Sequence, residues 1–156
     1  MDDLLKTIEE LEKQEKEIVF KSFGPDDAFD IGVRLINKAK EMNVYYAISV
    51  SLNRRKLFHF SMDGACPDND RWIMRKENVV YNFFKSSLRV RLEFERDGFD
   101  FNQMFALSND QFANFGGGFP INVEGVGVVG TVSISGLPHE LDHQYVVDVL
   151  REYLAK

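Results

Sequence analysis

The fold is decided by one stretch of the chain, Gly125-Val126-Gly127-Val128-Val129-Gly130-Thr131-Val132-Ser133-Ile134-Ser135-Gly136-Leu137-Pro138. Its β-branched residues predict a buried strand over Gly127–Ser135, and Pro138 suits the first turn of a helix. The glycines fit the pattern G-x-G-x-x-G, but they lie inside the strand, whereas a dinucleotide-binding loop needs them at a strand-to-helix turn. The stretch therefore predicts a strand that passes directly into a terminal helix, without a phosphate-binding loop.

Outward from this stretch, helical and β patterns alternate along the chain. Apolar residues at helical spacing predict a helix between Leu4 and Ile18, and Gly24-Pro25-Asp26-Asp27 is typical of the start of a second one. Asp68-Asn69-Asp70 caps a third helix that runs to about Lys85. The predicted strands are rich in β-forming residues, and the first two form a hairpin: Val44–Leu52, Lys56–Met62, Gln111–Gly117, Phe119–Glu124 and Gly127–Ser135.

One segment, Ser86–Arg96, fits two patterns. Leu88, Val90, Leu92 and Phe94 alternate with charged residues, which is typical of a strand. The two serines at its start equally suit the cap of a helix. The residues alone leave both interpretations open.

The composition excludes several classes of protein. The chain has 156 residues with a formal charge of −6, which disfavours a nucleic-acid binder because such proteins need a basic surface. No run approaches the roughly 18 apolar residues of a membrane span, and the acidic start lacks the apolar core of a secretory signal. The single Cys66 forms no internal disulfide. We therefore expect one cytoplasmic domain over residues 1–156.

The most conspicuous motif is His139-Glu140-Leu141-Asp142-His143, which matches the H-E-x-x-H signature of zinc metalloproteases. Two imidazoles at i and i+4 share a helix face, but a catalytic zinc usually takes a third protein ligand, and the following residues supply no obvious one. The alternative is a solvated first helical turn whose acids complement the helix dipole. We favour that alternative and expect no bound metal.

Four less conspicuous segments carry a family resemblance. They are Trp72–Val80, which contains W-x-x-R-K-x-N, the pair Ser86-Ser87, the turn Gly116-Gly117-Gly118-Phe119-Pro120-Ile121, and the stretch that ends Ser135-Gly136-Leu137-Pro138. As an ordered set, they resemble the GlcG/HbpS-like superfamily, which includes the C-terminal domain of PduO-type proteins, and within it the branch labelled haem-degrading domain.

This resemblance implies an α+β, profilin-like fold with a five-stranded antiparallel sheet and helices on both faces. It favours the helix at 86–96. It also implies a homo-oligomer, and some members of the superfamily bind haem or another tetrapyrrole. No catalytic residue is carried over from the resemblance.

The residue most indicative of function is Lys76, the only charge on a helix face formed with Trp72, Val79 and Phe83. An unpaired ammonium in apolar surroundings is costly, so Lys76 must snorkel, pair with an acid such as Asp142, or contact a ligand. We expect a pocket for a small anionic ligand. Its expected residues are Trp72, Arg75, Lys76, Asn78, Ser86, Ser87, Gly116, Gly117, Pro120, Ser135, Asp142 and His143.

Three functions compete. The leading one is a module that binds a small carboxylate-bearing molecule, with haem or another tetrapyrrole as the cofactor class. The second is a haem-degrading or zinc-dependent enzyme, and the third is a structural or chaperone-like oligomer. A homo-oligomer is expected because six phenylalanines crowd a segment rich in glycine and polar residues, where exposed rings favour an interface. They are Phe99, Phe101, Phe105, Phe112, Phe115 and Phe119.

Overall fold

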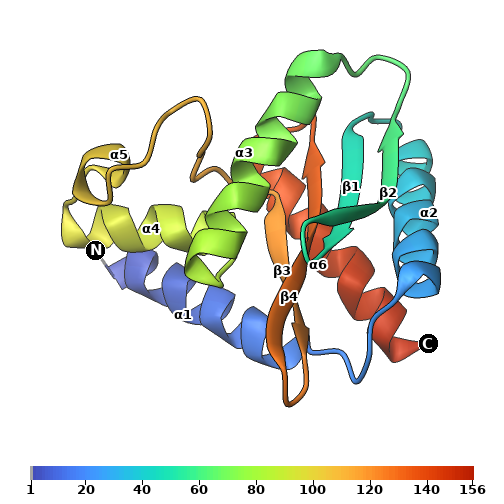
Figure 1. Ribbon diagram of the computed structural model, residues 1–156, viewed down its shortest axis with the longest axis horizontal. Helices are drawn as coiled ribbons and strands as arrows, with labels where there is room; N and C mark the ends of the chain where they lie inside the picture. The colour runs from blue at the N-terminus through green and yellow to red at the C-terminus, as the bar shows by residue number, and fades with distance from the viewer. Residues whose placement is uncertain (1) are drawn as a thin grey trace.

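The computed structural model describes residues 2–156, and its centre is an antiparallel sheet (Figure 1). Within these residues the sheet has four strands in the order β2-β1-β4-β3. The positive φ angles of Asn53 (51°) and Arg54 (62°) form the tight hairpin that joins β1 to β2, as predicted from the sequence. The strands are β1 (Ala47–Leu52), β2 (Arg55–Ser61), β3 (Gly118–Val123) and β4 (Gly127–Ser135).

The prediction of five strands is therefore wrong for residues 2–156. The segment at 111–117, predicted as a strand, is irregular instead. Its backbone groups form hydrogen bonds with residues of a neighbouring helix rather than with another strand. The Ala113 N–H donates to the carbonyl oxygen of Arg75 over 3.2 Å, and the Asn78 amide donates to the carbonyl oxygen of Gln111 over 2.7 Å. With its polar groups bonded to a helix, this segment forms no ladder with β3.

Helices cover both faces of the sheet, as expected. In Figure 1, α3 crosses in front of the sheet, while α2 and α6 lie behind it. No helix in residues 2–156 combines the length and apolar character needed to cross a membrane. The helices are α1 (Asp2–Glu17), α2 (Pro25–Met42), α3 (Pro67–Phe83), α4 (Ser87–Asp97), α5 (Phe101–Met104) and α6 (His139–Ala155).

Helix α4 resolves the two interpretations of 86–96. Ser86 is its N-cap, since the Arg89 N–H donates to the Ser86 hydroxyl oxygen over 3.3 Å. Leu88 and Val90 are buried, whereas the other apolar residues of the alternating pattern, Leu92 and Phe94, are only partly covered. The serine cap thus outweighs the alternating pattern.

The two faces of the sheet differ in chemistry. On the α2 and α6 side, Ile48, Val50, Val132 and Ile134 form part of the main hydrophobic core. Alternate residues point to opposite faces of a strand, so the intervening positions face α3. These positions carry hydroxyls, and they are buried: Ser49, Ser51, Thr131, Ser133 and Ser135. Helix α3 therefore packs against a polar surface, and the buried hydroxyls of that surface need hydrogen-bond partners.

Candidate functional site

Glu77 on α3 satisfies most of this hydroxyl surface. Its Oε2 atom accepts hydrogen bonds from Ser49 (3.1 Å), Ser51 (2.9 Å) and Thr131 (3.0 Å). The sequence interpretation missed these four residues. The signal was present in the alternation of serine or threonine with valine and isoleucine in β1 and β4, which marks a strand whose second face is polar but buried.

Lys76, next to Glu77, pairs with an acid from the far end of the chain. Its Nζ lies 3.1 Å from Asp142 Oδ2 and donates to the Ile134 carbonyl oxygen over 3.1 Å. The second Asp142 oxygen accepts from the Leu137 N–H over 3.1 Å. Lys76 is 2% exposed and Asp142 is 1% exposed. The interpretation of Asp142 as part of a solvated first turn is therefore wrong, because α3 covers it.

Burial dominates the titration of both partners. Desolvation raises the pKa of Asp142 to about 6, although Lys76 and the Leu137 N–H pull it downward. Desolvation likewise lowers the pKa of Lys76 against the attraction of Asp142. Burial thus opposes the charged form of both partners, and the attraction between them offsets part of that cost.

The pair forms the floor of an open cleft of about 320 Å³. One wall is aromatic: the Trp72 and Phe115 rings meet edge-on with centroids 5.1 Å apart, and Phe115 meets the His139 ring at the same distance. Ser135 and Leu137 lie beside the pair, and Asp68 stands at the exposed rim. The first turns of α3 and α6 both open onto the cleft, so two helix N-termini favour negative charge there.

His139 is held in one tautomer. The Gly116 N–H donates to its Nδ1 over 2.9 Å, so Nδ1 carries a lone pair and the neutral ring must carry its proton on Nε2. Burial lowers the pKa of His139, which favours the neutral ring. His143, by contrast, is buried against α1, with its Nε2 atom 2.8 Å from Gln14 Oε1. The two imidazoles of the H-E-x-x-H motif thus have separate partners.

Four of the predicted site residues line the cleft together: Trp72, Lys76, Ser135 and Asp142. Arg75 lies behind the aromatic wall, where its guanidinium packs over the Trp72 ring at 4.5 Å and donates to the Asn109 carbonyl oxygen. Asn78 holds the 111–117 segment, and His143 faces away into the α1 contact. The structure gives these three residues bonds outside the cleft.

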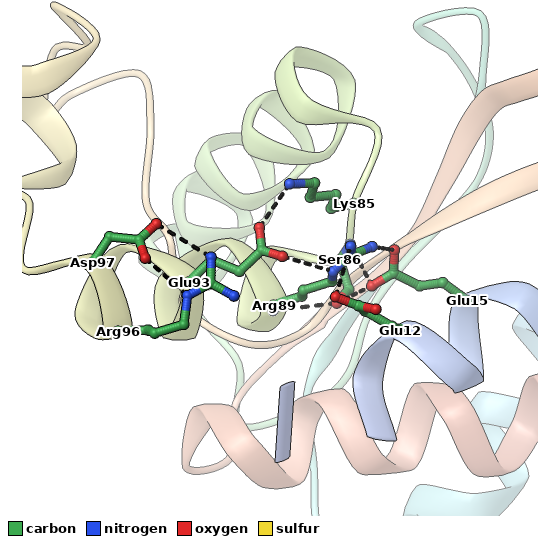
Figure 2. A network of polar contacts seen from close by, with 8 residues as sticks. All are labelled: Glu12, Glu15, Lys85, Ser86, Arg89, Glu93, Arg96 and Asp97. Atoms are coloured by element: carbon green, nitrogen blue, oxygen red, sulfur yellow. Dashed lines mark hydrogen bonds and ion pairs between the residues drawn. The ribbon is translucent and has the colours of Figure 1, made fainter. Parts of the chain in front are cut away.

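Ser86 and Ser87 also have structural partners. The Ser86 hydroxyl donates to Glu15 Oε2 over 3.0 Å, and Glu15 belongs to the charged network around Arg89 that joins α1 to α4 (Figure 2). The Gly118 N–H donates to the Ser87 hydroxyl oxygen over 3.0 Å. The two serines therefore attach α4 to α1 and β3 and do not line the cleft.

The glycines at 116–118 allow the chain to pass between α3, β4 and α6. A Cβ atom on Gly117 would lie 2.7 Å from Lys76 Nζ, and one on Gly116 would lie 2.4 Å from the His139 carbonyl oxygen. Pro120 follows inside β3, buried opposite Thr131. Gly116 and Gly117 thus let the backbone pass close beside the ion pair and His139, while Pro120 lies farther along β3, and none of the three lines the cleft.

Comparisons with known proteins agree with this architecture. A UPF0303 protein of Streptomyces coelicolor is 41% identical over 96% of this chain and 95% of its own length. One from Rhizobium etli is 40% identical over 100% of this chain and 93% of its own. The crystal structure of the Ybr137w protein superposes with a TM-score of 0.87 at 30% identity, covering 96% of this chain and 90% of that one.

Two more distant structures share the fold. HbpS superposes with a TM-score of 0.68 at 16% identity, over 85% of this chain and 89% of that one. PduOC, solved in complex with haem, superposes with a TM-score of 0.70 at 16% identity, over 85% and 94%. The family model described as "Haem degrading protein HbpS-like" matches residues 23–151. The chain belongs to the HbpS-like family.

Proposed function

We propose that the cleft above Lys76 and Asp142 binds a small ligand that carries a carboxylate beside a planar ring. The observation that carries the proposal is the buried ion pair at the floor of an aromatic-walled cleft. An ion pair with so little exposure adds little to stability, because removing both charges from water offsets their attraction. Its position at an opening favours a role in recognition.

The donors of the cleft suit a carboxylate. An ammonium has three N–H donors, and within residues 2–156 Lys76 uses two of them, toward Ile134 and Asp142. The third is available to an acceptor that enters the cleft. The first turns of α3 and α6 add partial positive charge. The edges of Trp72 and Phe115 supply contacts for a flat conjugated ring.

A tetrapyrrole with propionate groups has both features, and the related PduOC was solved with haem. The cleft volume of about 320 Å³ suits one edge of such a molecule or a smaller planar acid. His139 does not fit the role of an axial ligand to iron. A ligating histidine usually donates its second N–H to an acceptor, whereas His139 Nδ1 receives the Gly116 N–H. We therefore propose recognition through the carboxylate and the ring, within a homo-oligomer.

The test is a fluorescence titration with protoporphyrin IX, which has the carboxylates and the ring but no metal. Trp72 is the single tryptophan of the chain and lies in the cleft wall, so binding there quenches it. The Asp68→Lys variant reverses a charge at the rim without touching the buried pair. We expect it to tighten binding about fivefold, since a rim charge some distance away acts through water.

The matched control is Glu41→Lys, which changes the net charge equally on α2, across the sheet from α3. We expect its affinity for protoporphyrin IX to equal that of the wild type. Equal tightening in both variants would mean that net charge alone attracts the porphyrin. No quenching in any of the three proteins would overturn the proposed function.

A further inference from the structure

The single cysteine of the chain, Cys66, lines the cleft. Its side chain is exposed and stands at the N-cap of α3, directly before Pro67. The Cys66 N–H donates to Asn69 Oδ1 over 3.0 Å, and the Asn69 N–H donates to the Cys66 carbonyl oxygen over 2.9 Å. Pro67 adds a fixed φ angle. These features hold the backbone of a thiol that a ligand in the cleft can reach.

Lys76 indicates independently that the cleft takes a ligand. It is 2% exposed, and within residues 2–156 two of its three N–H donors have acceptors. A buried donor without an acceptor costs free energy, which an oxygen atom entering the cleft would recover. The thiol of Cys66 thus lines a cleft whose floor already offers a donor to a ligand.

The side chains of the chain suit an iron porphyrin better than a bare metal ion. Within residues 2–156, no three side chains of the metal-binding types His, Cys, Asp and Glu gather closely enough to hold an ion. A porphyrin itself supplies the nitrogen ligands in its plane, so the protein needs to provide only an axial one. A cysteine thiolate is among the axial ligands that proteins use for haem iron.

The histidines of the chain are poorly placed to bind an iron atom in the cleft. His139 accepts the Gly116 N–H on Nδ1, so binding iron through Nε2 would move its proton to Nδ1, against that N–H. His143 is buried against α1, and His59 pairs with an aspartate outside the cleft. Of the residues that line the cleft, Cys66 is therefore the one best suited to bind iron.

We propose that Cys66 is the axial ligand to iron when the cleft binds ferric haem. On binding, the thiol gives its proton to water and its sulfur forms a bond to the iron, which stays ferric. The N-terminus of α3 favours the negative charge of the thiolate, while Lys76 donates to a propionate. The inference rests on the proposed function and narrows its ligand from planar carboxylates to an iron porphyrin.

Absorbance titration with haemin, which is ferric protoporphyrin IX, tests the iron bond, with metal-free protoporphyrin IX as the reference and no added thiol. Cys66→Ser removes the sulfur and keeps a side chain that suits an N-cap. We expect this variant to bind haemin about tenfold or more weakly than the wild type, with a shifted Soret band. Its affinity for protoporphyrin IX should equal that of the wild type, because that ligand has no iron.

The matched control is Ala65→Ser, which adds the same hydroxyl beside Cys66 but outside the cleft lining. It should keep the wild-type affinity for haemin and the wild-type Soret band. Equal haemin affinity and Soret position in the wild type and Cys66→Ser would overturn the proposal, as would equal weakening in Ala65→Ser or no binding of haemin. Binding of protoporphyrin IX by the wild type is measured separately, so failure of the iron bond is distinguishable from failure of the cleft.

Discussion

The His143 side chain is buried as a neutral imidazole. It is 3% exposed, its Nε2 atom faces Gln14 Oε1, and burial lowers its pKa to about 4. The amide oxygen accepts a hydrogen bond, so it places the proton on Nε2 and leaves Nδ1 as an acceptor. In residues 2–156, Nδ1 has no hydrogen-bond partner. Protonation would therefore put an uncompensated charge between α1 and α6.

This burial predicts a pH-dependent stability. An unfolded histidine takes up a proton below about pH 6.5, but the folded His143 does so only near pH 4. The contribution of the buried His143 to the free energy of unfolding is therefore fully present above pH 6.5 and is lost as the pH falls toward 4. The free energy of unfolding of the wild type, relative to His143→Gln, should rise by about 3 kcal/mol from pH 4 to pH 6.5.

Urea unfolding of both proteins at several pH values measures this difference. Asp142, whose pKa is raised to about 6, changes the free energy of unfolding with pH in the opposite direction. Its contribution to that free energy is present below pH 3.8 and is lost as the pH rises through 6. Both proteins contain Asp142, so its effect cancels in the comparison. A difference that stays flat with pH would show that His143 is not kept neutral by the fold.

At the scale of elements, the 116–118 turn brings α3, β4 and α6 together. Gly117 has a φ of 128°, and a Cβ atom placed on it would crowd Lys76, Ile134 and Asp142. A side chain here meets both a strained backbone and the ion pair. Gly125, in the β3–β4 turn, also has a positive φ (76°) but has open space around it.

These two glycines form a matched pair of variants. Gly125→Ala should cost about 1 kcal/mol of unfolding free energy, through backbone strain alone. Gly117→Ala should cost about 3 kcal/mol or more, because crowding of the Lys76 pair adds to that strain. Thermal or urea unfolding compares them. Equal losses would mean that the chain does not pass this closely beside Lys76.

Local signals made most elements predictable. The hairpin, the Pro-led helices and the strand at 127–135 follow from turn residues, caps and β-branched runs that lie within the elements themselves. The segment at 111–117 was wrongly predicted as a strand because its pairing depends on Arg75 and Asn78, more than 30 residues away. Composition within a segment does not reveal a backbone that bonds to a distant helix.

At the scale of the whole molecule, the candidate site shows again that local sequence patterns do not reveal contacts between distant segments. Lys76 was identifiable as a lone charge on an apolar helix face, and Asp142 was a candidate partner. The hydroxyls that bind Glu77 and the serines that attach α4 depend on packing between distant segments. Sequence patterns therefore indicated the residues at the centre of the cleft, while the other predicted residues make contacts outside it.

The crowded phenylalanines illustrate a second whole-molecule effect. Phe101 and Phe119 are buried, and Phe94 and Phe101 pack against Phe83 of α3. Much of the predicted exposed segment thus folds back into a small core of its own, with Phe99 and Phe105 left half-exposed. The homo-oligomer stays a prediction.

The most direct test of the cleft is native mass spectrometry with protoporphyrin IX and its dimethyl ester, which differ only in their free carboxylates. If Lys76 and the two helix N-termini recognise a carboxylate, the acid binds at one molecule per chain and the ester at least about tenfold more weakly. The same spectra report the number of subunits. Equal binding of acid and ester, or binding of neither, would contradict the account.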